Sequence, residues 1–65
     1  MFVLICYDIA NPRRLRRVAR ETENFGLRVQ DSVFECHLDD AELHELQRRL
    51  ARLLDPRQDR VRYYR

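Results

Sequence analysis

The segment Phe2-Val3-Leu4-Ile5-Cys6-Tyr7-Asp8 sets the architecture of the chain, because apolar and aromatic residues run without a break into a carboxylate. Such a short run, rich in β-branched and aromatic side chains, predicts a strand covered on both faces. Asn11 and Pro12 follow and predict a helix with Asn11 as its N-cap and Pro12 at its first position. Gly26 predicts the C-terminal stop of this helix. Its buried face is expected at Leu15, Val18, Ala19, Thr22 and Phe25.

Three more strands and a second helix are predicted downstream. The strands are expected at residues 27–30, 33–38 and 60–65, where apolar and polar side chains alternate. The second helix begins after Asp39 or Asp40, and Glu42 is placed for a capping box if Asp39 is the N-cap. Its buried stripe is expected at Leu43, Leu46, Leu50, Leu53 and Leu54.

The element order is therefore βαββαβ, which predicts one α+β domain over residues 1–65 with a ferredoxin-like fold. This fold is an antiparallel sheet with both helices on one face and the first and third strands in the middle. The other face is left open, although the first strand is apolar on both faces. A domain of this size also buries only about 60% of its unfolded surface. We therefore expect a homodimer in which a second copy covers the open face, sheet against sheet.

The composition excludes some classes of protein but does not name a function. No apolar run approaches the roughly 20 residues of a membrane-spanning helix, and 2 cysteines allow at most one disulfide. We therefore expect a cytoplasmic protein without membrane contact. All 13 basic residues are arginine, against 11 acidic residues, and the net charge is +2. Either a GC-rich genome or selection for bidentate phosphate contacts, which lysine does not make, explains this usage.

Asp8 is the first candidate for chemistry, because it is a carboxylate at the end of a buried strand and just before a helix. In that place it can serve the helix dipole or pair with an arginine. It can also hold Mg²⁺, which binds through one or two carboxylates plus waters and substrate phosphate. A two-fold dimer across the open face would bring two Asp8 side chains together and complete such a site.

The predicted first helix carries a cluster of arginines on the face opposite its apolar stripe, and no acidic residue lies between positions 11 and 20. A run of one sign is either a solvated helix face or a contact surface for phosphates. The second helix differs, because its arginines follow acidic residues and predict a mixed surface. The candidate nucleic-acid contacts on the first helix are Arg13, Arg14, Arg16, Arg17 and Arg20.

The remaining residue patterns argue against several other functions. Cys36 and His37 are neighbours on a predicted strand and so point to opposite faces, which argues against a joint zinc site. The same strand lacks the aromatic-glycine signature of an RNA recognition motif. The tyrosines, Tyr7 among them, suit either base stacking or core packing. A small-molecule regulatory domain of the same fold would need a ligand pocket that no motif indicates.

Taken together, these features resemble the small CRISPR-associated endoribonuclease family, the non-integrase subunit of the complex that acquires CRISPR spacers. The resemblance spans nearly the whole chain and includes an arginine-bearing first helix and a leucine-striped second helix. It is carried by Tyr7-Asp8-Ile9, Gly26-Leu27-Arg28-Val29-Gln30, Ser32-Val33-Phe34-Glu35 and Asp59-Arg60-Val61-Arg62-Tyr63-Tyr64. Relatives continue beyond the fourth strand, and we expect that a C-terminal closing segment is missing from this sequence.

The resemblance implies a homodimer in which Asp8 of each subunit binds Mg²⁺, or another divalent cation such as Mn²⁺, and acts in phosphodiester hydrolysis. The substrate would be single-stranded RNA, double-stranded DNA or both, and the CRISPR integrase subunit would be a partner. Arg17, Arg28 and Phe34 fall at motif positions linked to activity or substrate contact, and Tyr7 is a further possible contact.

Two other functions remain open for a chain of this kind. One is a non-catalytic adaptor that binds duplex DNA and bridges integrase dimers. In such an adaptor Asp8 takes no part in catalysis. The other is a toxin-like ribonuclease of the same fold.

Overall fold

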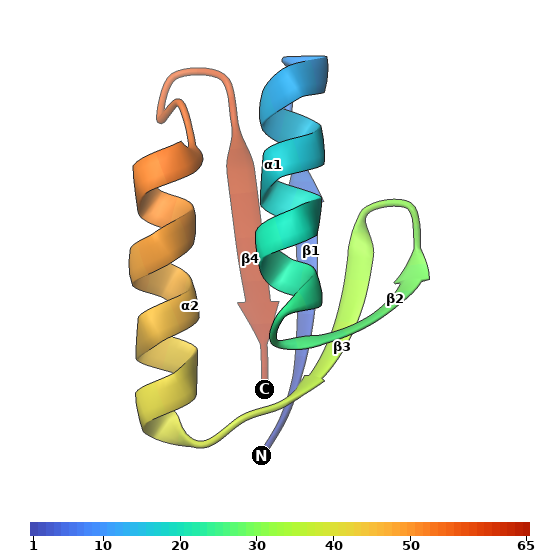
Figure 1. Cartoon of the computed structure of the whole chain (residues 1–65), viewed down its shortest axis with the longest axis vertical. Helices are drawn as coiled ribbons and strands as arrows, with labels where there is room; N and C mark the ends of the chain where they lie inside the picture. The colour runs from blue at the N-terminus through green and yellow to red at the C-terminus, as the bar shows by residue number, and fades with distance from the viewer.

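The computed structural model describes the whole chain, residues 1–65, and has the predicted βαββαβ order. The four strands form one antiparallel sheet in the order β2-β3-β1-β4, with β1 and β3 in the middle. Both helices lie on the same side of the sheet (Figure 1). The ferredoxin-like α+β fold is therefore confirmed. The elements are β1 (Phe2–Asp8), α1 (Pro12–Glu23), β2 (Gly26–Gln30), β3 (Val33–His37), α2 (Asp40–Leu53) and β4 (Arg60–Tyr64).

Strand β1 places alternate side chains on the two faces of the sheet, and only one of these faces is covered. Val3, Ile5 and Tyr7 point under the helices and are buried, whereas Asp8 at the end of the strand is exposed on the other face. The open face also carries Leu27, whose side chain is 68% exposed. Within one chain, β1 is thus covered on one face only. Neither helix is long and apolar enough to cross a membrane.

Both helix starts follow the capping chemistry that the sequence predicts. The Asn11 side chain accepts hydrogen bonds from the backbone N–H groups of Arg13 and Arg14, at 2.9 and 3.1 Å. Asp39 caps α2, and its side chain and that of Glu42 exchange hydrogen bonds with each other's backbone N–H, which completes a capping box. The apolar stripe of α2 packs on the core through Leu43, Leu46 and Leu50, with Leu53 and Leu54 at its margin.

The role predicted for Gly26 is wrong. Helix α1 ends at Glu23 with Asn24 as its C-cap, and Gly26 does not adopt a positive φ. It is instead the first residue of β2, opposite Cys36. A Cβ at this position would collide with the Cys36 Sγ and with the Glu35 carbonyl oxygen. Glycine is needed because the two strands and a buried thiol approach closely there.

A buried carboxylate joins the first helix to the last strand. The Asp59 side chain has no exposed surface and accepts two hydrogen bonds from the Arg14 guanidinium, at 2.8 and 3.2 Å. It also accepts the backbone N–H of Ala10 at 3.1 Å and that of Asp55 at 2.8 Å. Arg14 is the main cause that lowers the pKa of Asp59 from 3.8 to about 2. This ion pair fixes the β1–α1 loop against the turn before β4.

We expect Asp59→Asn to lower the free energy of unfolding at neutral pH, because the amide cannot form the ion pair with Arg14. The lowered pKa means that the folded state favours the ionised carboxylate. The contribution of this carboxylate to the free energy of unfolding is therefore complete above pH 3.8 and is lost as pH falls towards 2. Urea unfolding between pH 2 and 7 should therefore show a gap between wild type and variant that narrows below pH 4. A gap of constant size would contradict this account.

Candidate functional site

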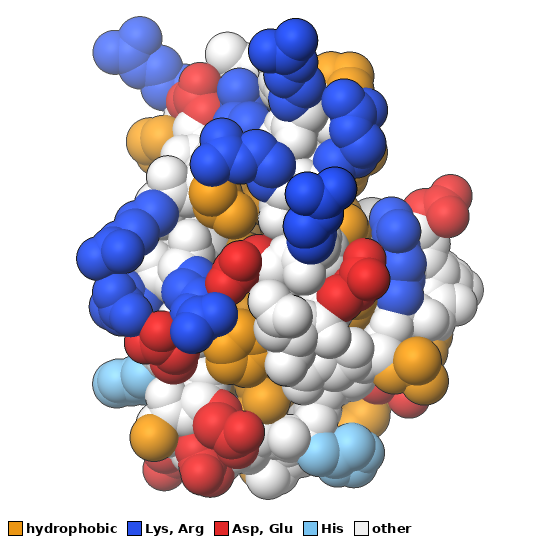
Figure 2. Space-filling view, viewed as in Figure 1, with side chains coloured by type: hydrophobic (Ala, Val, Ile, Leu, Met, Phe, Trp, Pro, Cys, Tyr) orange, Lys and Arg blue, Asp and Glu red, His pale blue; other side chains and the backbone are white.

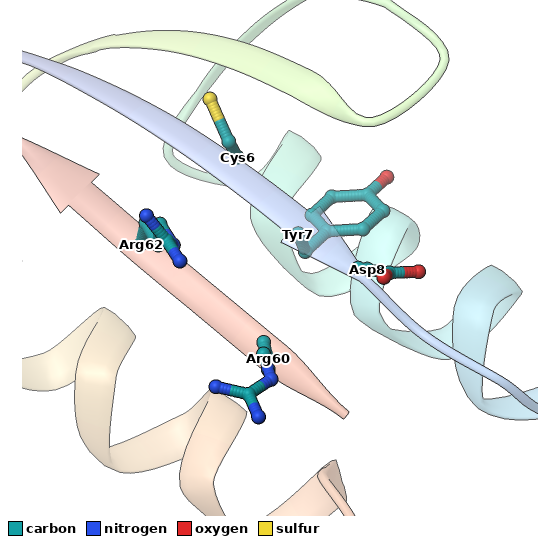
Figure 3. Close-up of a pocket in the computed structure, with 5 residues that line it drawn as sticks. All are labelled: Cys6, Tyr7, Asp8, Arg60 and Arg62. Carbon is teal, nitrogen blue, oxygen red and sulfur yellow. The ribbon is translucent and has the colours of Figure 1, made fainter. Parts of the chain in front are cut away.

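Asp8 lies at the edge of a shallow hollow on the open face of the sheet. It is the last residue of β1 and pairs across the sheet with Arg60 of β4, while Cys6 pairs with Arg62. Because directly paired residues point to the same face, Asp8, Arg60 and Arg62 all project away from the helices. The hollow has a volume of about 230 Å³ and is lined by Cys6, Tyr7, Asp8, Arg60 and Arg62 (Figure 3).

The Asp8 carboxylate is exposed and takes part in no salt bridge, although two guanidinium groups share the hollow. Figure 3 shows that the Asp8 carboxylate and the Arg60 guanidinium point away from each other, although their strands are neighbours. The carboxylate is therefore free to bind a cation. The two arginines give the same hollow an excess of positive charge, which suits an anionic ligand.

The hollow contains the type of ligand that a hard divalent cation prefers, but only one such residue. The carboxylate oxygens of Asp8 are the donors that Mg²⁺ prefers. No group of three or more His, Cys, Asp or Glu side chains is close enough to hold a metal ion anywhere in the chain. One chain thus supplies a single carboxylate, and a second protein ligand at this site would have to come from another copy. Asp8 faces the side of the sheet on which a second copy can approach.

Four arginines of α1 form a separate basic surface. Arg13, Arg16, Arg17 and Arg20 line a hollow of about 220 Å³ that contains no other residue. All four are exposed, and none forms a salt bridge. Figure 2, which looks onto the helix layer, shows basic side chains gathered over the first part of α1. We call these four residues the α1 arginine surface.

The α1 arginine surface and Asp8 lie in different layers of the fold. Helix α1 lies on one side of the sheet (Figure 1), whereas the alternating burial along β1 places the Asp8 side chain on the other. This arrangement does not bring the predicted phosphate contacts Arg13, Arg14 and Arg17 to the face of the sheet that carries Asp8. Arg14 departs further, because its guanidinium is bound to buried Asp59 and is only 23% exposed. The structure gives Arg14 a place in the ion pair between α1 and the turn before β4.

The remaining predicted contacts, Tyr7, Arg28 and Phe34, lie near one another, and of the three only Tyr7 also lines the Asp8 hollow. Tyr7 and Phe34 are 6% and 0% exposed, and their ring centroids lie 6.1 Å apart under the helix layer. The Arg28 guanidinium lies 5.9 Å from the Phe34 centroid and donates to the Asp31 carbonyl oxygen at 2.6 and 3.0 Å. The Tyr7 hydroxyl donates to the same oxygen at 3.1 Å. Burial raises the pKa of Tyr7. Of the three predicted contacts, only Arg28 is exposed.

The arginines of α2 behave as the sequence predicts. Arg48 and Arg49 both pair with Glu45, at 2.7 and 2.8 Å, and Arg49 also pairs with Glu21 of α1 at 2.8 Å. These two arginines lower the pKa of Glu45. The surface of α2 is thus a mixed one, on which Arg48 and Arg49 pair with acids, in contrast to that of α1.

Sequence reasoning missed Arg60 and Arg62 as residues of the Asp8 hollow. The signal was present, because both alternate with Val61 and Tyr63, which pack towards the core. Alternation alone places the arginines on the open face. Their position beside Asp8 depends on the antiparallel pairing of β4 with β1, which is a long-range feature.

Comparison with known proteins identifies relatives along the whole chain. The chain is 45% identical to the CRISPR-associated endoribonuclease Cas2 of Chlorobaculum tepidum, over 98% of this chain and 72% of the relative. It is 44% identical to the CRISPR-associated endonuclease Cas2 of Halalkalibacterium halodurans, over 100% of this chain and 73% of the relative. The crystal structure of Streptococcus pyogenes Cas2 at pH 6.5 superimposes with a TM-score of 0.94 and 40% identity, covering 100% of this chain and 84% of that one.

The model of the family CRISPR associated protein Cas2 matches residues 1–65, which is the full extent of the sequence. The relatives and the solved structure agree with this match in both sequence and fold. The chain belongs to the CRISPR associated protein Cas2 family.

Proposed function

We propose that this protein is a metal-dependent endonuclease that acts as a homodimer, with Asp8 of each subunit at the metal site. The observation that carries the proposal is the exposed Asp8 carboxylate, which stands on the open sheet face without an ionic partner. The names of the relatives, endoribonuclease and endonuclease, support phosphodiester hydrolysis. The substrate class is single-stranded RNA or duplex DNA.

The homodimer follows from the open face of the sheet. Phe2, Leu27 and Tyr64 are 44%, 68% and 49% exposed, although all three are large and apolar or aromatic. A patch of this kind is typical of an interaction surface. A two-fold axis through it would place the same patch on both subunits and would bring the two Asp8 side chains towards one another. The second copy thus supplies both the missing cover and the second carboxylate.

The reaction is the addition of water across a P–O bond of the nucleic-acid backbone. The water oxygen bonds to phosphorus, the P–O bond to the leaving sugar oxygen breaks, and that oxygen gains a proton. A bound divalent cation supplies positive charge to the phosphate and makes water more acidic. Asp8 holds the cation and thereby fixes where hydrolysis occurs. No histidine or glutamate lines the hollow, so no side chain there is placed to act as a general base.

We expect Asp8→Asn to lower the rate of cleavage by roughly a hundredfold or more, since the amide keeps the shape but loses the charge that holds the cation. The measurement is a cleavage time course on single-stranded RNA and on duplex DNA, with Mg²⁺, with Mn²⁺ and with chelator. The preferred substrate decides between ribonuclease and deoxyribonuclease activity.

Asp31→Asn is a matched control, because it removes an exposed acid whose carboxylate forms no salt bridge, away from the hollow. It should leave the cleavage rate unchanged. Sedimentation at micromolar concentration should show a dimer for wild type and for both variants. A folded monomer that still cleaves would contradict the shared site, because Asp8 of a second copy would then not be needed.

The second candidate function is a duplex-DNA-binding adaptor that bridges integrase dimers without cleaving nucleic acid. The α1 arginine surface favours it, because four exposed guanidiniums without acidic partners suit phosphate contacts. Both functions place the protein with the CRISPR integrase subunit in the cytoplasm. No observation favours a toxin-like ribonuclease over a member of the CRISPR family.

We expect Arg13→Ala with Arg17→Ala to weaken duplex DNA binding and to reduce the slope of log K against log salt by about 2, since each phosphate contact contributes about 0.9. Binding is measured in chelator, so that cleavage does not interfere. Arg48→Ala with Arg52→Ala is the control, because it removes the same charge from α2. If the two double variants change the salt slope equally, the effect depends only on net charge, and the α1 arginine surface is not a specific binding site for DNA.

A further inference from the structure

Two arginines of β4, separated by one residue, lie on the open face of the sheet. Arg60 and Arg62 are exposed, and they stand opposite Asp8 and Cys6 of β1. Residues two apart on a strand project from points about 7 Å apart. Val61 and Tyr63 alternate with them and pack against the core. Burial raises the pKa of Tyr63 to about 12, in keeping with its place under the helices. The two arginines therefore stand on a strand that is anchored from its other side.

Neither arginine has an acidic partner within the chain, although both line the same hollow as a carboxylate. Figure 3 shows both guanidiniums extending from β4, apart from the Asp8 carboxylate. Tyr64 raises the pKa of Arg62 through a side-chain hydrogen bond, but no carboxylate pairs with either guanidinium. The planar fork of an arginine matches the oxygens of a phosphate. A carboxylate by itself repels a phosphate. A site that brings a phosphodiester to Asp8 thus needs positive charge close by.

We propose that Arg60 and Arg62 bind the phosphates of the nucleic-acid strand that is cleaved at Asp8. This inference rests on the proposed function, and it identifies the residues that hold the substrate there. The α1 arginine surface does not take this role, because it lies in the other layer of the fold. The chain therefore has two phosphate-binding surfaces: β4 serves the site of hydrolysis, and α1 binds the backbone elsewhere.

The first test measures cleavage by Arg60→Gln, by Arg62→Gln and by the double variant. Each single change should lower kcat/KM by roughly tenfold or more, because a charge-assisted hydrogen bond to the phosphate is lost. The conservative changes Arg60→Lys and Arg62→Lys keep the charge and should recover part of this loss. Arg57→Gln is the control, because it removes an exposed arginine outside the hollow, and it should cleave like wild type. Thermal unfolding and sedimentation should match wild type for every variant, which shows that a loss of cleavage is not a loss of the proposed dimer, whose covered face carries Arg60 and Arg62.

The second test measures binding without hydrolysis. A single-stranded tetranucleotide is added to the isotopically labelled protein in chelator, and amide shifts are followed by NMR. In wild type, the largest shifts should fall at Asp8, Arg60 and Arg62. The double glutamine variant should lose these shifts, whereas the Arg57→Gln control should keep them.

The two tests separate the inference from the function on which it rests. If wild type cleaves through Asp8 and the double variant cleaves equally well, the role of Arg60 and Arg62 is wrong and the nuclease stands. If nothing cleaves but the tetranucleotide shifts depend on the two arginines, β4 binds phosphates and the nuclease proposal fails. Shifts confined to α1 would overturn the inference whatever the cleavage assay shows.

Discussion

The covering of β1 on one face only is the constraint from which the other features follow. A strand in the middle of a sheet must bury alternate side chains, and here the two helices bury Val3, Ile5 and Tyr7. The intervening residues, including Asp8, are left on a face that has no layer over it within the chain. Burial of apolar surface is the main favourable contribution to folding, so a small domain with an uncovered apolar face is suited to association. The residue placed for chemistry lies on that same face.

Local chemistry explains why so much of the fold could be predicted from the sequence. The Asn11 cap and the Asp39–Glu42 capping box involve residues at most three positions apart, and the structure has both of them. The alternation in β3 is equally local. It predicts that Cys36 and His37 point to opposite faces, and in the structure Cys36 is buried and His37 is exposed. Where a feature depends only on residues within one helical turn or one strand, the prediction from sequence agrees with the structure.

The features that could not be predicted depend on pairs that are far apart in the sequence. Arg14 was assigned to a nucleic-acid contact because its neighbours are arginines, but its partner Asp59 lies 45 positions away. Glycine is required at position 26 because Cys36 approaches closely, and the place of Arg60 is set by its pairing with Asp8. Proximity in sequence was misleading for the α1 arginines too. The chain passes from one layer to the other between Asp8 and Pro12, so residues a few positions apart serve different surfaces.

Each layer of the fold carries its own arginines, so the two proposed functions do not depend on the same residues. If one surface had to serve both, a nuclease and an adaptor would compete for the same arginines. Here the helix layer carries the α1 arginine surface, and the sheet layer carries Asp8 with two arginines of its own. The buried Arg14–Asp59 pair joins these layers at the end where Asp8 lies, through the N–H of Ala10. Under the two proposals, loss of hydrolysis would leave duplex binding intact, because the α1 arginine surface and Asp8 lie in different layers. A chain built in this way can act as an adaptor whether or not its open face performs chemistry.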